Sequence, residues 1–149
     1  MSKETSSANP VETRPLFYIV DWLPPDFGAV GQYAVSFATE IAASGRRVEL
    51  IGLTSGSARV TEEQFHGGGS LRTTRIATSS YDKSKNLHRL LWTLRTNLRL
   101  ISEVIVNPRS RRAEVLFTGA PAFMLPFSFI AKVLRRAKLS YRITDFFPK

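Results

Sequence analysis

Leu16-Phe17-Tyr18-Ile19-Val20 and the loop that follows it, Asp21-Trp22-Leu23-Pro24-Pro25-Asp26-Phe27-Gly28-Ala29-Val30-Gly31, decide the fold of this chain. The first five residues are all apolar, and an amphipathic pattern with helical spacing runs from about residue 29 to 44. An uninterrupted apolar run of this length is typical of a strand covered on both faces of a parallel sheet. We therefore predict a strand, a Pro/Gly turn and a helix whose N-terminus can accept an anionic group.

The rest of the chain repeats this alternation of strand and helix. We predict strands at residues 48–53, 70–77, 115–117 and 139–144, and helices at 86–106 and 122–136. Residues 61–66 are interpreted as a short mixed segment before a flexible triglycine loop, and 70–77 as a strand nearer an edge. The order predicts an α/β domain with a Rossmann-like, mainly parallel, doubly wound sheet.

Three apolar patterns specify faces of these helices. In the first helix the apolar stripe contains Val30, Tyr33, Ala34, Phe37, Ala38, Ile41 and Ala42, and Gly45 ends the helix. In the long helix one apolar face is marked by Leu87, Leu90, Leu91, Leu94, Leu98, Ile101 and Ile105. Segment 122–136 is apolar on nearly all sides, which indicates either a buried helix or one that touches a membrane or partner. Pro126 either kinks that helix or begins it.

Composition limits the classes of protein. The 149 residues divide into a polar lead, 1–15, expected to be disordered, and one domain, 16–149. The chain has no cysteine and only two distant histidines, so we expect no disulfide and no metal site. It has neither a signal-peptide pattern nor an apolar run of about 20 residues. We expect a cytoplasmic protein, with peripheral contact at the inner face of the membrane still open.

The charge is distributed unevenly along the chain. Residues 1–82 hold 7 basic and 9 acidic side chains, whereas residues 83–149 hold 14 basic and 3 acidic ones, a net of +11. A solvated basic surface, an anionic membrane and a phosphorylated substrate are all compatible with this half. Nucleic acid is not expected, because no helix-turn-helix, zinc or single-strand-binding aromatic motif is present.

Ligands of doubly wound sheets bind beyond the carboxyl ends of the strands, where we predict three turns: 21–31, 118–121 and 145–148. Asp21, Asp26 and Asp145 are the carboxylates there that can orient a hydroxyl or act as a base. For Asp21 and Asp26, turn or cap chemistry is the favoured interpretation. The glycine spacing excludes a dinucleotide fingerprint, and no P-loop is present, so no resident cofactor is expected.

Several segments together resemble the N-terminal domain of family 4 glycosyltransferases, which have the two-domain GT-B fold, and in particular the branch that makes surface polysaccharides. The stretch 24–31 is similar to the opening P-x-x-G-G-x-G loop of that family, and 42–53 to its G-H-x-V strand. The stretches 115–121 and 141–148 are similar to the fourth and fifth strands of the branch. The match covers about residues 16–149 in order and spacing.

The resemblance implies a sugar transferase, hexosyltransferase-like, that uses a nucleotide sugar and a saccharide or lipid-linked acceptor. It implies a cleft-facing loop at Asp26, Gly28, Ala29 and Gly31, with Ala29 in place of the second glycine of the family pair. A second cleft turn contains Thr118, Gly119 and Pro121, where the family often has a histidine. Asp145 matches the aspartate after strand five and is the catalytic candidate, and Pro148-Lys149 replaces the usual Pro-Glu.

The family's C-terminal domain, which grips the donor, has no counterpart in these 149 residues. The expectation is therefore an incomplete enzyme: a truncated product or one half of a split enzyme whose donor domain is a separate chain, inactive alone. The basic region 83–149 would hold it at an anionic membrane. The alternative is a non-catalytic Rossmann-like scaffold that docks a partner or anionic membrane through the same region.

Overall fold

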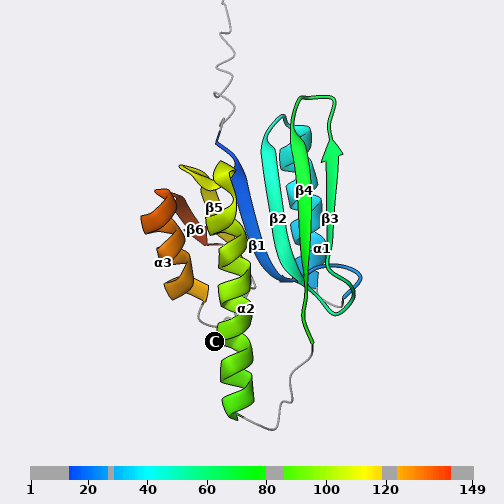
Figure 1. The fold of residues 1–149 in the computed structure, drawn as a ribbon. Helices are drawn as coiled ribbons and strands as arrows, with labels where there is room; N and C mark the ends of the chain where they lie inside the picture. Colours follow the sequence, from blue (N-terminus) through cyan, green and yellow to red (C-terminus); the bar gives the residue numbers. More distant parts are fainter. Residues whose placement is uncertain (1–13, 27–28, 80–85, 119–123, 142–149) are drawn as a thin grey trace, which may run out of the picture.

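The computed structural model describes residues 14–26, 29–79, 86–118 and 124–141. Within them, six strands form one sheet in the order β3-β4-β2-β1-β5-β6, with helices on both faces (Figure 1). The strands are β1 (Leu16–Trp22), β2 (Arg47–Thr54), β3 (Arg59–Gln64), β4 (Ser70–Ala77), β5 (Glu114–Phe117) and β6 (Lys138–Tyr141). The helices are α1 (Ala29–Ala43), α2 (Asn86–Val106) and α3 (Met124–Arg135), with a 3-10 turn, η1 (Pro108–Ser110), after α2. The predicted α/β class and mainly parallel sheet are confirmed.

Strand β1 is the central element of the sheet. It pairs in parallel with β2 on one side and β5 on the other, so that Leu16 lies opposite both Val48 and Glu114. Its side chains alternate between two cores: Phe17 packs in the core of α2 and α3, whereas Tyr18 packs in the core of α1. Burial on both faces is the reason why this strand is a continuous apolar run.

Helix α1 approaches the sheet closely because its buried face is made of small residues. The buried positions are Gly31, Ala34, Ala38 and Ala42. The predicted stripe is wrong at Tyr33, which is 74% exposed. The helix ends as predicted, with Gly45 in the left-handed region at φ 100°.

The strand β3 is a correction to the sequence interpretation of 61–66 as a mixed segment. It pairs antiparallel with β4 and forms the edge of the sheet, and β4 is the second strand, near the edge as predicted. The prediction failed because Arg59–Gln64 is charged on both faces and lacks the apolar alternation of a half-buried strand. The triglycine segment forms the hairpin turn, where the amide of Gly68 donates to the carbonyl of Phe65.

Helix α2 has the predicted bounds, but the face marked by leucines is only partly the one that packs. Ile101 is buried, whereas the five leucines N-terminal to it in that pattern are between 36% and 66% exposed. The buried positions are instead Thr93, Thr96, Asn97, Leu100, Ile101 and Val104. Asn107 stops the helix and caps η1, its side-chain oxygen accepting a hydrogen bond from the amide of Arg109.

Helix α3 begins at Met124, so Pro126 lies in its first turn, where proline is tolerated. Met124, Ser128 and Ala131 are buried and Phe127 packs against the core, whereas the large apolar side chains at 125, 129, 130, 133 and 134 are exposed. The segment is therefore not a fully buried helix. In the described ranges no helix has both the length and the apolar character needed to cross a bilayer.

Truncating Leu100 and Leu98 separately tests which face of α2 is packed. Leu100 is fully buried and Leu98 is 52% exposed. We expect Leu100→Ala to lower the free energy of unfolding by about 2–5 kcal/mol, because it leaves a cavity in the core. Leu98→Ala should change it by no more than about 0.5 kcal/mol. Urea denaturation followed by circular dichroism measures both, and equal losses would contradict this orientation of the helix.

Candidate functional site at the carboxyl edge of the sheet

The switch point of the sheet lies between β1 and β5. The chain leaves β1 through α1 to β2 on one side of it, whereas β5 lies on the other side. In doubly wound sheets the crevice at this point, beyond the carboxyl ends of the strands, is where ligands bind. Asp21 and Trp22 end β1, and the buried Thr118 follows β5, its amide donating to the carbonyl of Ile19 at 3.1 Å. Two of the three predicted turns therefore start at neighbouring strand ends.

The turn after β1 is tied to both β2 and β4. The amide of Leu23 donates to the carbonyl of Leu53 at 2.9 Å, and Arg75 donates through Nε to the carbonyl of Pro24 at 3.2 Å. Between these contacts the Pro24–Pro25 peptide bond is cis. The turn is thus held by one backbone hydrogen bond to β2 and one hydrogen bond from a side chain of β4.

Asp26 is the main side-chain tether of this turn. Its carboxylate accepts hydrogen bonds from the Thr54 hydroxyl at 2.8 Å, from the Ser55 amide at 3.1 and 3.2 Å, and from the Ser55 hydroxyl. Desolvation alone would raise the pKa of Asp26, but the hydrogen bonds from Ser55 and Thr54 outweigh it and lower the pKa below its usual value. A carboxylate so engaged is a poor proton acceptor, so the turn interpretation of Asp26 fits better than that of a base.

Gly31 lies where the first turn of α1 meets the end of β1. A Cβ atom there would overlap the carbonyl oxygen of Trp22, so only glycine allows this approach of helix to strand. The contact explains the glycine by packing, in addition to any role beside a ligand. Ala29, the first residue of α1, is exposed at the same edge.

Gly31→Ala and Gly56→Ala form a matched pair of substitutions. At Gly31 the added methyl group meets backbone, which must shift, whereas at Gly56 it meets only the Thr54 hydroxyl at an ordinary 3.6 Å. We expect Gly31→Ala to cost about 1–3 kcal/mol of unfolding free energy and Gly56→Ala to be close to neutral. Chemical denaturation of both variants checks this, and a neutral Gly31→Ala would refute the packing explanation.

Asp21 is the second carboxylate of this turn, and its environment differs from that of Asp26. It lies at the end of β1, and its Oδ1 accepts a hydrogen bond from the amide of Trp22 at 2.7 Å. Desolvation by burial raises the pKa of Asp21, and the hydrogen bond to the Trp22 amide offsets this only in part. A carboxyl group with a raised pKa at the switch point is suited to hold or accept a proton.

The raised pKa of Asp21 predicts how stability depends on pH. The folded state binds the proton more tightly than the unfolded state, so this group's contribution falls as pH rises from 3.8 through the folded pKa. Asp21→Asn removes the partly buried charge and keeps an acceptor for the Trp22 amide. We expect the variant to melt at a higher temperature than the parent at pH 7, with the difference vanishing near pH 3. A variant less stable at pH 7 would contradict the desolvation of Asp21.

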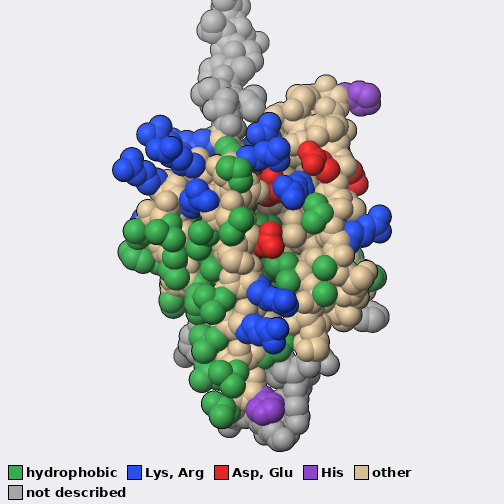
Figure 2. All heavy atoms as spheres, in the orientation of Figure 1, with side chains coloured by type: hydrophobic (Ala, Val, Ile, Leu, Met, Phe, Trp, Pro, Cys, Tyr) green, Lys and Arg blue, Asp and Glu red, His purple; other side chains and the backbone are tan. Residues whose placement is uncertain are grey.

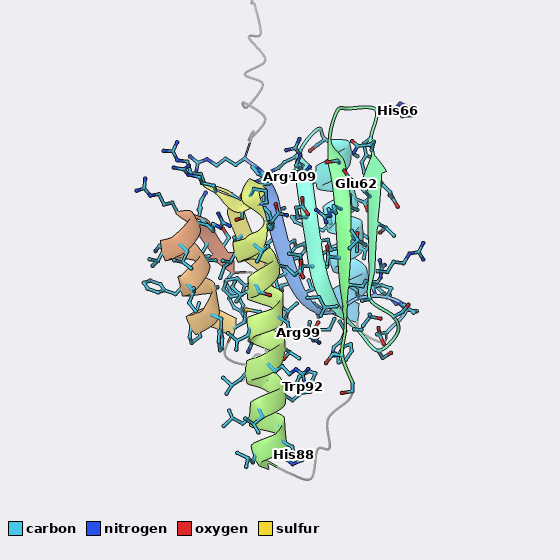
Figure 3. The ribbon with its side chains drawn as sticks, in the orientation of Figure 1. Glu62, His66, His88, Trp92, Arg99 and Arg109 are labelled. Carbon is cyan, nitrogen blue, oxygen red and sulfur yellow. The ribbon has the colours of Figure 1, made fainter. Side chains whose placement is uncertain are left out.

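Two aromatic rings border this end of the sheet. Trp22, from β1, and Trp92, from α2, stack with centroids 6.3 Å apart and planes at 20°. The Trp92 Nε1 donates to the carbonyl of Ser79, just after β4, at 2.8 Å. Figure 3 labels Trp92 on the N-terminal half of α2, and Figure 1 shows that this half extends beyond the carboxyl edge. These are the only two tryptophans of the chain.

Half of the predicted site residues lie outside the described residues. These are Gly28, Gly119, Pro121 and Asp145. Of the others, Asp26, Ala29 and Gly31 belong to the first turn and the helix after it, and Thr118 follows β5. Strand β6 ends at Tyr141, and the predicted strand residues after it are outside the description too. The catalytic candidate Asp145 therefore remains a prediction.

Two cavities lie between α2 and the sheet, one beside β2 and β4 and the other beside β3 and β4. One, of about 350 Å³, is lined by Glu49 together with Arg72 and Arg109; the other, of about 470 Å³, is lined by residues that include Arg99. Glu49 is buried, with Arg109 at 3.4 Å and Arg72 at 3.9 Å. A buried charge needs such partners, so we interpret Glu49 and the two arginines as a structural ion-pair cluster. Sequence analysis missed it because its members are distant in the chain.

Among the residues that the structure describes, no group of three or more His, Asp or Glu side chains is placed to hold a metal ion. His66 lies at the tip of the β3–β4 hairpin and His88 at the start of α2, far apart in the fold (Figure 3).

Comparison with known proteins gives the fold its context. No family model and no curated protein matches the chain. Solved structures of similar fold include the alpha,alpha-trehalose-phosphate synthase (UDP-forming) of Burkholderia vietnamiensis, with a TM-score of 0.52 and 12% identity. They also include the alpha,alpha-trehalose 6-phosphate synthase of Burkholderia multivorans, with a TM-score of 0.50 and 11% identity. Each match covers 92% of this chain and 34% of the other, so the chain spans about a third of either synthase. The chain has the Rossmann-like fold found in GT-B glycosyltransferases.

Proposed function

We propose that this chain is the acceptor-side domain of a family 4 glycosyltransferase that moves a hexose from a nucleotide sugar to a saccharide or lipid-linked acceptor. One observation carries the proposal: 92% of the chain shares its fold with part of two trehalose-phosphate synthases, one of them UDP-forming. The motif resemblance of 24–31, 42–53 and 115–121 points to the same class. Polysaccharide biosynthesis is the branch to which these motifs are most similar.

Sugar transfer needs protein groups on both sides of a cleft, one side for the acceptor and the other for the donor. An acceptor oxygen bonds to the anomeric carbon, the bond from that carbon to the diphosphate breaks, and the acceptor proton passes to a base. Stabilising the leaving diphosphate is the larger electrostatic task, which we assign to a donor domain, in this chain's continuation or in a separate chain. The carboxyl edge described above would orient the acceptor hydroxyl, through Asp21 at the end of β1 and Asp145 after the last strand.

The second candidate function is a non-catalytic binding domain of the same fold. It is favoured by the exposed apolar faces of α2 and α3, which a sugar-transfer site does not require. A nicotinamide oxidoreductase is disfavoured by the glycine spacing of the first turn.

Trp22 and Trp92 make the candidate site observable by fluorescence, because the chain contains no other tryptophan. We expect saccharides, sugar phosphates or lipid-linked sugars to shift or quench the emission, and NAD to leave it unchanged. Asp21→Asn should weaken the acceptor response, whereas Glu62→Gln, on the exposed strand β3, should not. No response to any sugar compound would contradict an acceptor-side site.

Transfer itself is tested with radiolabelled nucleotide sugars, including UDP-glucose, together with the same acceptors. We expect no product from the 149-residue chain alone and product when a donor-domain chain is added. Turnover by the chain alone would contradict the assignment of the donor grip to another domain.

A further inference from the structure

The exposed apolar side chains of this protein are concentrated on two helices. Of the fourteen large hydrophobic side chains that are exposed within the described residues, eleven belong to α2 and α3. On α2 they are Leu87, Leu90, Leu91, Leu94, Leu98 and Val106, and on α3 they are Leu125, Phe129, Ile130, Val133 and Leu134. The two helices pack against each other, so these side chains belong to one surface, here called the α2–α3 face.

The apolar side chains of the α2–α3 face form a continuous surface in the space-filling view (Figure 2). Figure 2 shows the apolar side chains covering α3 and running down the length of α2. Scattered exposed leucines are normal, but a contiguous apolar surface on two neighbouring helices marks an interaction site. The buried side of α2 contains polar groups such as Thr96 and Asn97, whereas most of its leucines are exposed.

The charges on α2 and α3 indicate which kind of partner the α2–α3 face can bind. Helices α2 and α3 carry five basic side chains and one acidic one: Arg89, Arg95, Arg99, Lys132 and Arg135 against Glu103. Figure 2 shows basic side chains above the apolar surface and along one side of it. A second copy of the chain docked through this face would bring two cationic borders together. An anionic surface is the complementary partner.

We propose that the α2–α3 face docks the protein onto an anionic lipid bilayer. The leucines of α2 and the apolar side chains of α3 enter the boundary between headgroups and acyl chains, and the bordering Arg and Lys side chains contact lipid phosphates. Sugar transfer does not require the α2–α3 face, so membrane docking goes beyond the proposed function. Because the N-terminal half of α2 passes the carboxyl edge of the sheet, docking brings Trp92 and the switch point close to the bilayer (Figure 1).

Vesicle co-sedimentation of the full chain tests the proposal. The probes are phosphatidylcholine vesicles with and without roughly 30% phosphatidylglycerol, each at low salt and at about 0.5 M NaCl. Electrostatic attraction to the anionic vesicles is strong at low salt and largely screened at high salt. We expect binding to the anionic vesicles at low salt, and weaker binding to the neutral vesicles and at high salt. The apolar variant Leu91→Ser with Phe129→Ser should reduce the partition coefficient about tenfold. The charge variant Arg95→Gln with Lys132→Gln should reduce it about tenfold on anionic vesicles.

Matched controls come from other surfaces. Tyr33→Ser removes an exposed apolar side chain from α1, on the opposite face of the sheet, and Arg59→Gln removes an exposed charge from β3. Neither should change binding. All variants alter exposed residues, and circular dichroism verifies that each stays folded.

Two outcomes would overturn the proposal. One is vesicle binding that the α2–α3 variants leave unchanged. The other is no vesicle binding together with a dimer in sedimentation velocity that Leu91→Ser with Phe129→Ser dissociates, which would assign the face to a second copy. Loss of sugar binding in the fluorescence assay leaves the vesicle result unaffected, so the two proposals fail separately.

Discussion

The pairing of β1 with a parallel strand on each side is the constraint on which the rest of the structure depends. A strand with neighbours on both edges and helices on both faces is sealed from water, which is why Leu16 to Val20 are all apolar. Parallel neighbours require crossover connections, and α1 supplies one of these on one face of the sheet while α2 and α3 cover the other. The carboxyl ends of β1 and β5 then become the switch point. The candidate site is thus a consequence of where β1 lies.

Sequence reasoning succeeded where burial leaves a continuous apolar run, as in β1 and β2, or a periodic pattern, as in β4 and the first two helices. It failed at β3, whose charged residues lie at a sheet edge and need no apolar face. It also could not tell which side of α2 packs. Thr96 can be buried because its hydroxyl donates to the carbonyls of Trp92 and Thr93 within the same helix. Hydropathy values do not take such hydrogen bonds into account.

The strand ends at the carboxyl edge were predictable from the sequence, but the surroundings of the side chains there were not. The order of the strands predicts these turns, and parallel topology brings residues 21–26, 29–31 and 118 to one edge. The environments of the carboxylates could not be read from the chain, because the hydroxyl groups that engage Asp26 belong to residues 54 and 55, distant in sequence. Asp21 and Asp26 are five residues apart, yet their pKa values shift in opposite directions. The sequence pattern at Gly31 is compatible with a ligand-binding loop, whereas the structure shows that the glycine is needed for the close contact between α1 and the end of β1.

The hairpin of β3 and β4 has a consequence for how the chain folds. Every other strand pair in the described sheet is parallel and joins residues separated by a crossover, so its formation carries the entropy of closing a long loop. The hairpin pairs residues 59–64 with 70–75 through a short turn and can form in microseconds. It offers an early template along which β2 and then β1 can align, so the strand that looks least like part of the sheet is suited to nucleate it.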